Sequence, residues 1–423
     1  MAASVADGTT GQPRWRPGAD AAPLPGRLAL ASEAFSGAID YLMPRARADY
    51  LDIAQHELAP LVNGFYLGDP AADDLVAAIR ASHGGARAQF DKALEHGIDT
   101  VPDPLSEVSA FLATVDEVPD WIDEELVEVG VRALRRIDAI TFLGAGWVLG
   151  FLLAAIVPNS SRSMASNARA VRNAGQRFAE TGRITLDMFD RGGRGRFGAG
   201  TRSSSRLRVL HAAVRAQLRR RGDWDESVYG VPISATDVLM AALMPGASAL
   251  AAKRAGYRFS PRELAGIAHF NGLFAYRQGS PAALIPSTFD GQTKALYFAL
   301  RGARGQVDSE STDRLMPALV NIEIPGLPGV AQRAVRAVFN GYARRIFGPQ
   351  LCAATGIPDT PVRHLIPLGS VLIRPFEVMR CQLRVVDLAA HSGADLMWRR
   401  LMPLVLSDRA DYGWSHIDKI VKH

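Results

Sequence analysis

The chain has very little cysteine and lysine. Cys352 and Cys381 are its only cysteines, which argues against a disulfide framework and favours a reducing compartment, so we expect a cytoplasmic protein. Its basic residues are almost all arginine, and the formal net charge of +5 is small for 423 residues. The sequence also lacks a nucleophile elbow, a Walker loop, a dinucleotide fingerprint and zinc-type cysteine spacing. These absences exclude several common enzyme classes.

Alternating strand patterns are scarce as well, whereas helical periodicity runs through most of the chain, so the sequence predicts an all-α fold. Ser203, Ser204 or Ser205 is expected to cap a helix that ends at Gly222. The run at 260–263 (SPRE) supplies a cap, a first-turn proline and an acidic residue in the expected order. Helices are predicted over 46–63, 71–95, 104–114, 121–136, 139–157, 168–190, 205–221, 234–254, 261–276, 329–347 and 374–390.

Composition divides the chain into three parts. Residues 1–25 are rich in Ala, Gly, Pro and Asp and predict a disordered lead-in rather than a signal peptide. Irregular stretches are expected at 190–205 and at 301–328. The second stretch, rich in proline, predicts a helical main domain at 26–305 and a C-terminal helical extension at 306–423 that packs on it.

One long uncharged run lies at 139–157 (AITFLGAGWVLGFLLAAIV). Its 19 residues reach the lower limit of membrane-spanning length. Three glycines dilute the run, Pro158 ends it, and no companion span is expected. We therefore interpret it as a buried core helix and predict no stable membrane insertion; a membrane span is the alternative.

Three polar residues border apolar helix faces and together suit a haem. Arg177 and Thr181 lie four residues apart on one helix face, and His211 follows 30 residues after Thr181. A cation can pair with a propionate, a hydroxyl can lie near dioxygen, and an imidazole can ligate iron. His211 shares an apolar stripe with Leu207, so a structural histidine is the alternative. Arg215, one turn further on, is a second candidate for a propionate.

Several short motifs also occur in the order and spacing of a known family. With them the chain resembles the haem-dependent oxygenase family that includes latex clearing protein (rubber oxygenase) and the mycophenolic acid pathway oxygenase. The resemblance covers about residues 135–285, roughly a third of the chain. The matching motifs are Arg177-x-x-x-Thr181, His211, 229–237 (YGVPISATD), 256–264 (GYRFSPREL) and His269.

The resemblance implies a globin-like helical core that holds haem b. His211 would be the proximal iron ligand, Arg177 and Thr181 would line the cofactor pocket, and Trp147 would belong to its apolar wall. Relatives use dioxygen to cleave a carbon–carbon double bond in isoprenoid chains. We therefore expect dioxygen and an apolar, isoprenoid-like small molecule as the partners of this chain.

The chain departs from the family on the distal side of the iron. Rubber-cleaving relatives carry a lysine immediately before the threonine, and this chain has Glu180 there. The distal glutamate of the relatives has no counterpart in 158–162 (PNSSR). We predict that Glu180 acts with Thr181 in catalysis, as an acid or base, with a salt-bridged surface residue as the alternative. The departures argue against rubber as the substrate.

Two other function classes stay open. Arginine and glycine concentrate between Arg191 and Arg221, which is typical of some nucleic-acid-binding segments. Only Phe197 interleaves there and the net charge is low, so we expect no nucleic-acid partner. The other class is a haem or lipid carrier, or a gas sensor, without turnover; the missing distal glutamate and lysine support it. The oligomeric state is left undetermined by the sequence.

Overall fold

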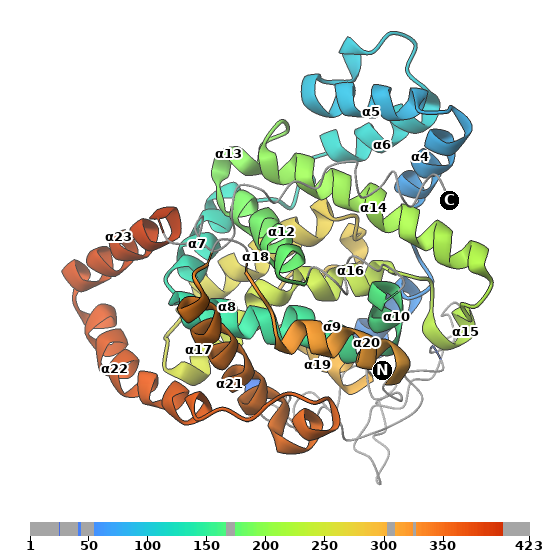
Figure 1. Cartoon of the computed structure of the whole chain (residues 1–423). Coiled ribbons are helices and arrows are strands. Elements are labelled where there is room, and N and C mark those ends of the chain that lie inside the picture. The colour runs from blue at the N-terminus through green and yellow to red at the C-terminus, as the bar shows by residue number, and fades with distance from the viewer. Residues whose placement is uncertain are drawn as a thin grey trace.

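The computed structural model describes residues 55–165, 174–302, 309–324 and 327–400, together with Pro25 and 41–43. Every regular element in these ranges is a helix, which confirms the all-α prediction (Figure 1). The predicted lead-in at 1–25 and the predicted starts of the helices at 46–63 and 168–190 lie almost wholly outside the described residues. The elements are α3 (Gln55–Gly64), α4 (Pro70–Ala81), α5 (Gly85–His96), η1 (Ile98–Thr100), α6 (Ser106–Asp116), α7 (Glu124–Arg135), α8 (Ala139–Trp147), η2 (Val148–Leu152), α9 (Leu153–Ile156), α10 (Pro158–Ala165), α12 (Ala174–Phe189), α13 (Arg191–Arg194), α14 (Ala199–Arg221), α15 (Glu226–Tyr229), α16 (Ala235–Ala242), α17 (Met244–Ala255), α18 (Pro261–Arg277), η3 (Ala282–Leu284), α19 (Phe289–Gly302), α20 (Ser309–Val320), α21 (Gly329–Ala354), α22 (Val362–Gln382) and α23 (Arg384–Arg400).

Helices α7 and α18 approach each other closely at Gly130 and Gly266. A Cβ atom on Gly130 would lie 2.1 Å from the carbonyl oxygen of Gly266, so any larger residue would force the two helices apart. Helix α18 begins with the predicted cap: the Ser260 hydroxyl accepts from the Glu263 amide, and the Glu263 carboxylate accepts from the Ser260 amide. The start of this helix is therefore as the sequence predicted.

The uncharged run forms a broken helix in the core, made of α8, the π-helical turn η2 and α9. Asp138 caps α8 by accepting from the Thr141 amide at 2.9 Å. By length and composition, two helical stretches of the described chain could cross a membrane, Ala139–Ile156 and Ala235–Ala255. The second contradicts the expectation that the first has no companion. However, 61% and 78% of the two stretches are buried inside the protein, as is typical of core helices.

Helix α14, which carries His211, begins earlier than predicted. Its N-cap is Gly198, so the three serines at 203–205 lie inside the helix rather than at its start. Ser205 donates from its hydroxyl to the carbonyl of Thr201 at 2.9 Å, the bond a serine makes inside a helix. Gly222 ends the helix with φ 72°, as predicted. The predicted loop at 190–205 also contains the short helix α13.

Two predicted helices are each divided into two. The span 71–95 breaks at His83 and Gly84, which both have positive φ. The span 234–254 breaks at Leu243, between α16 and α17. Periodicity misses such breaks because the apolar positions continue in register on both sides.

The C-terminal part departs further from the predicted helices. The predicted helix at 374–390 is interrupted at Leu383, whose φ of −119° and ψ of 108° are extended. The stretch 301–328, predicted to be irregular, contains α20 with Pro317 inside the helix. Proline costs one backbone hydrogen bond there, and burial of Leu315 and Leu319 on either side compensates for it.

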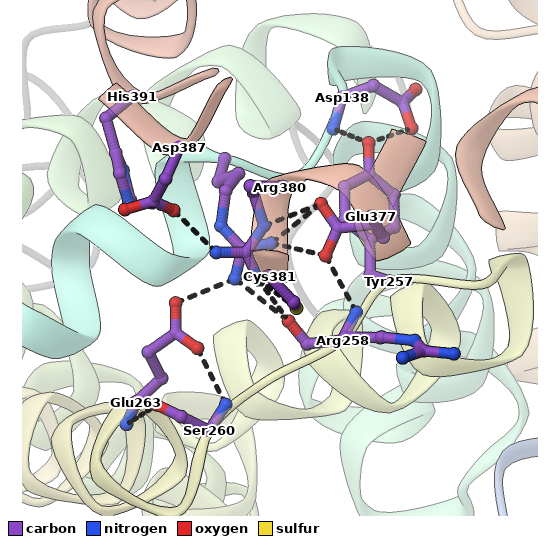
Figure 2. A network of polar contacts seen from close by, with 11 residues as sticks. Asp138, Tyr257, Arg258, Ser260, Glu263, Glu377, Arg380, Cys381, Asp387 and His391 are labelled. Carbon is purple, nitrogen blue, oxygen red and sulfur yellow. Dashed lines mark hydrogen bonds and ion pairs between the residues drawn. The ribbon is translucent and has the colours of Figure 1, made fainter. Parts of the chain in front are cut away.

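Helices α22 and α23 form an arm along one edge of the molecule (Figure 1). A buried ionic network fastens the arm to the body (Figure 2). Arg136, at the end of α7, donates to both carboxylate oxygens of Glu377 at 3.0 and 2.8 Å and to Glu263 at 2.7 Å. Arg380 donates to Glu377 at 3.0 Å and to Asp387 at 2.6 Å. The fully buried Glu377 carboxylate is therefore compensated by two guanidinium groups.

A candidate active site in an apolar cavity

A cavity of about 340 Å³ lies among α8, η2, α10, α12, α14 and α17. Its volume falls within the usual range of small-molecule sites. Arg177, Thr181 and His211 all line it, so the structure brings together the three residues that the sequence singled out. Most of the remaining lining is apolar or aromatic, including Phe142, Phe151, Phe178, Leu207, Met244 and Phe274.

Two glycines one turn apart leave room for the cavity. Gly146 and Gly150 both line it. The atom nearest to a Cβ would be 3.9 Å away at Gly146 and 4.0 Å away at Gly150, so side chains at these positions would enter the cavity. At Gly144, by contrast, a Cβ would lie 2.5 Å from the ring of Tyr342. Gly150 and the lining residue Phe151 belong to the π-helical turn, an irregularity that is frequent at functional sites.

Trp147, predicted to contact the cofactor, lies one layer behind the cavity wall. It is fully buried, and its ring stacks on Phe151 and Phe339 with centroid distances of 5.1 and 5.4 Å. Phe178 meets it edge-on at 5.0 Å. Phe151 and Phe178 line the cavity, whereas Trp147 lies behind them. Trp147 therefore supports the cavity wall and does not face a ligand.

His211 presents a neutral imidazole to the cavity. Burial first, and then the positive charges of Arg215 and Arg177, lower the pKa of His211 from 6.5 to about 3. The ring is therefore uncharged at physiological pH, which is the form that ligates metals. Its Nδ1 atom is enclosed and has no hydrogen-bond partner among the described residues. Nε2 is therefore the ring nitrogen available to a ligand in the cavity.

Arg177 and Thr181 supply the polar rim of the cavity from one face of α12. Thr181 lines the cavity and is also exposed to solvent, so an edge of the cavity lies at this turn of α12. Glu180 does not line the cavity in the described part of the chain, and its side chain is fully buried. Arg177 donates to its carboxylate at 3.3 Å. This placement does not fit the predicted contact of Glu180 with substrate; it fits a residue that positions Arg177.

Arg215 lies outside the described lining, although it follows His211 by one turn. Its guanidinium is buried and donates to the carbonyl oxygens of Pro232 at 3.0 Å and Ile233 at 2.9 Å, and to the Asp73 carboxylate. The donors of Arg215 are thus committed to the fold, which does not fit the predicted pairing with a propionate. Its effect on the site is electrostatic, because its charge lowers the pKa of His211.

Sequence reasoning assigned no role to Asp237, the one carboxylate among the described lining residues. Its Oδ2 accepts from the Ser234 hydroxyl at 2.7 Å and from the Ser234 amide at 3.2 Å, closing a capping box at the start of α16. The S-x-x-D pattern in the sequence signals a helix start and says nothing about a cavity. Asn159 and Ser163 of α10 also line the cavity, so the segment after Pro158 contributes amide and hydroxyl groups there.

Most arginines of the segment between Arg191 and Arg221 pair with carboxylates. Arg194 is buried against Glu124 and Glu128, and Arg208 pairs with Asp69 at 2.7 Å. Other arginines of the segment pair with acidic residues on neighbouring helices or turns, among them Arg196, Arg206, Arg215 and Arg219. These ion pairs reduce the number of arginines that could contact a nucleic-acid backbone, and the absence of a nucleic-acid partner stays a prediction.

His211 is the one histidine among the described residues that line the cavity. In the described ranges no three His, Cys, Asp or Glu side chains gather as a metal site. A metal ion held by His211 would therefore take its other ligands from a bound group, as iron does from a porphyrin. The residues present fit such a group: an available Nε2, two glycines that leave space, apolar walls and a cationic rim at Arg177.

The fold and the cavity together define an all-α protein with a single-histidine site. The chain belongs to the family of the ER-bound oxygenase mpaB/B′ and rubber oxygenase catalytic domain, whose model matches residues 134–375. It is therefore a member of an oxygenase family, and so of the oxidoreductases. The match runs across residue 305, where the sequence predicted a domain boundary.

The chain is also similar to two individual proteins. The rubber oxygenase of Streptomyces sp. (strain K30) is 24% identical over 240 residues, which make up 53% of this chain and 56% of the relative. The chain thus spans little more than half of the length of that relative. A structure of latex clearing protein in the closed state superposes with a TM-score of 0.61 at 19% identity and covers 80% of this chain and 91% of that chain. This second likeness shows the fold.

Proposed function

We propose that the cavity binds haem b, with Nε2 of His211 as the proximal iron ligand, and that the chain uses dioxygen to oxidise an apolar small molecule. The observation that carries the proposal is the position of His211: a neutral imidazole in an apolar cavity, reached by one cationic side chain, Arg177. Membership of an oxygenase family supports the reaction class.

When bound, haem supplies the redox-active iron that oxidation of a hydrocarbon by dioxygen requires. Nε2 of His211 would hold the iron of that group, because the ring is unprotonated at physiological pH. Arg177 offers a positive charge to an anionic edge, and its own position is fixed by Glu180. The aromatic layer around Phe151 and Phe178 excludes water from the space where an apolar chain would bind.

The substrate that suits this cavity is an apolar molecule with a carbon–carbon double bond, of isoprenoid character. The walls offer aliphatic and aromatic contacts with few polar groups. The curated relative is a rubber oxygenase. In this chain Glu180 stands at the position where the family resemblance implies a lysine, and its carboxylate accepts from Arg177. We therefore propose a small molecule rather than polyisoprene, acted on by oxidative cleavage of the double bond.

An absorption spectrum tests the cofactor first. The protein purified from haem-supplied cells, or the protein titrated with haemin, should show a Soret band and bind one haem per chain. A protein that takes up no haem overturns the proposal. Oxygen consumption by the ferrous form, with and without short isoprenoids, then tests the oxygenase step.

Haem binding without turnover is the second candidate function. It is favoured by Asp237, because the carboxylate that borders the cavity is already engaged in the cap of α16. A haem-loaded protein that consumes no oxygen with any isoprenoid offered would support this carrier or sensor function.

A further inference from the structure

The exposed apolar side chains of this protein concentrate on the arm. Of the sixteen large hydrophobic residues that are exposed in the described part of the chain, ten lie within 362–400. Leu372 and Val385 are 76% and 78% exposed, more than any of the six elsewhere. The ten are Leu365, Leu368, Val371, Leu372, Phe376, Met379, Leu383, Val385, Leu388 and Leu396. A concentration of this kind marks a binding surface rather than scattered surface residues.

On α22 the apolar residues share one helix face. Leu365, Leu368, Leu372, Phe376 and Met379 follow one another at intervals of three and four residues. Glu377 and Arg380 lie on another side of the helix, which is turned toward the body, and are buried in the network of Figure 2. The helix is thus amphipathic in an unusual sense, with its charged face turned inward and its apolar face turned outward.

The acidic and the basic residues of the arm differ in their exposure and pairing. All three of its carboxylates are engaged with the body or with the arm itself: Glu377 with Arg136, Asp387 with Arg380, and Asp395 with Arg135 at 3.4 Å. Glu377 is fully buried, and Asp387 and Asp395 are partly exposed within their ion pairs, whereas Arg384, Arg399 and Arg400 are exposed. The outer surface of α22 and α23 is therefore apolar and basic.

We infer that this surface, the outer face of 362–400, docks on an anionic lipid bilayer. Apolar residues flanked by arginine are the composition with which a helix lies in the plane of a membrane interface. A second copy of the chain fits less well, because a symmetric contact would bring the exposed arginines of both arms together, whereas the three carboxylates of each arm already pair with arginines of their own chain. The arm lies on the bilayer and does not cross it, since its inner face stays fastened through Glu377.

Docking there would also bring the cavity close to the lipid phase. Trp398, near the end of α23, lines the cavity and packs edge-on against Phe142 at 5.0 Å. An apolar molecule dissolved in the bilayer would then be close to the cavity of the docked protein. This link rests on the proposed function, whereas the docking itself does not.

Vesicle flotation of the full chain tests the docking. We expect the chain to float with phosphatidylcholine vesicles that contain about a third of phosphatidylserine, and more weakly with phosphatidylcholine alone. The double variant Leu368→Ser/Leu372→Ser should lower the partition coefficient about tenfold or more. Arg384→Gln/Arg399→Gln should lower it roughly fivefold per arginine on the anionic vesicles only. The matched control Val118→Ser/Val330→Ser removes two exposed apolar residues elsewhere and should float like the wild type.

Equal flotation of the wild type and the Leu368→Ser/Leu372→Ser variant overturns the inference. So does an absence of vesicle binding together with a dimer, in sedimentation velocity, that the same variant dissociates. Circular dichroism checks that each variant is folded. Because flotation needs neither haem nor turnover, its outcome is independent of the proposed oxygenase function.

Discussion

Arg177 donates a hydrogen bond of 3.3 Å to Glu180, one turn further along α12. The two residues differ in surroundings: the guanidinium borders the cavity, and the carboxylate is fully buried behind it. A buried carboxylate that holds an arginine positions it, whereas an acid or base must reach the reacting atoms. This relationship distinguishes Glu180, which positions Arg177, from Asp237, whose carboxylate lines the cavity.

Asp237→Asn should lower turnover by about a hundredfold or more if its carboxylate moves a proton in the cavity, because that is the usual size of an acid–base contribution. Glu180→Gln should lower turnover by less than about tenfold, because amide and carboxylate oxygens both accept from Arg177. Both variants should keep their Soret band. Steady-state oxygen consumption measures the two effects, and the reverse order would restore the catalytic role predicted for Glu180.

His211→Ala should lose most bound haem and stay folded, because the imidazole is the ligand supplied by the cavity. The ratio of Soret to protein absorbance after purification measures the loss. His269→Ala is the matched control: that ring accepts from the Asp123 amide and is not among the described lining residues. Full haem content in His211→Ala would show that the proximal ligand lies elsewhere.

The haem-free protein should lose stability as the pH falls from about 6.5 towards 3. The pKa of His211 in the folded chain is about 3, below its unfolded value of 6.5. Between these values the unfolded chain binds a proton that the folded chain does not, so acid favours unfolding, by on the order of 1 kcal/mol per pH unit. Urea midpoints across this range measure the slope. In His211→Gln the slope should be shallower; an unchanged slope would contradict the lowered pKa.

Gly146→Leu should reduce haem uptake, because the new side chain would extend into the cavity. We expect at least a tenfold weaker apparent affinity for haemin, measured by absorbance titration, because the leucine side chain would occupy space that the cofactor needs. Gly329→Leu is the control: a Cβ there meets no atom within 4 Å, and the residue lies away from the cavity lining. Wild-type affinity in Gly146→Leu would place the cofactor elsewhere.

Glu377→Ala should destabilise the chain by roughly 3–5 kcal/mol, because it leaves Arg136 and Arg380 buried without their shared carboxylate. Chemical denaturation measures the loss, and hydrogen exchange should increase first in α22. Asp395→Ala removes a half-exposed partner of Arg135 and should cost about 1 kcal/mol or less. Similar values for both variants would mean that the network does not fasten the arm.

Local patterns in the sequence were enough to predict the fold class and the three residues that meet at the cavity. Helical periodicity identified most helices, and the cap at Ser260 was where the sequence placed it. Arg177 and Thr181 are neighbours through helix geometry alone, and the apolar stripe of α14 turned His211 inward. The division at residue 305 and the cytoplasmic location stay predictions.

Only the tertiary structure decided what surrounds those residues. Asp237 reaches the cavity because α16 packs there, and its sequence pattern describes only a helix start. The sequence makes Arg215 a candidate partner of a propionate, yet Asp73, 142 residues away in sequence, accepts a hydrogen bond from its guanidinium. Likewise, whether a charged or an apolar helix face turns inward depends on its partner across space: Arg136 draws Glu377 into the body, and that leaves the apolar face of α22 outside.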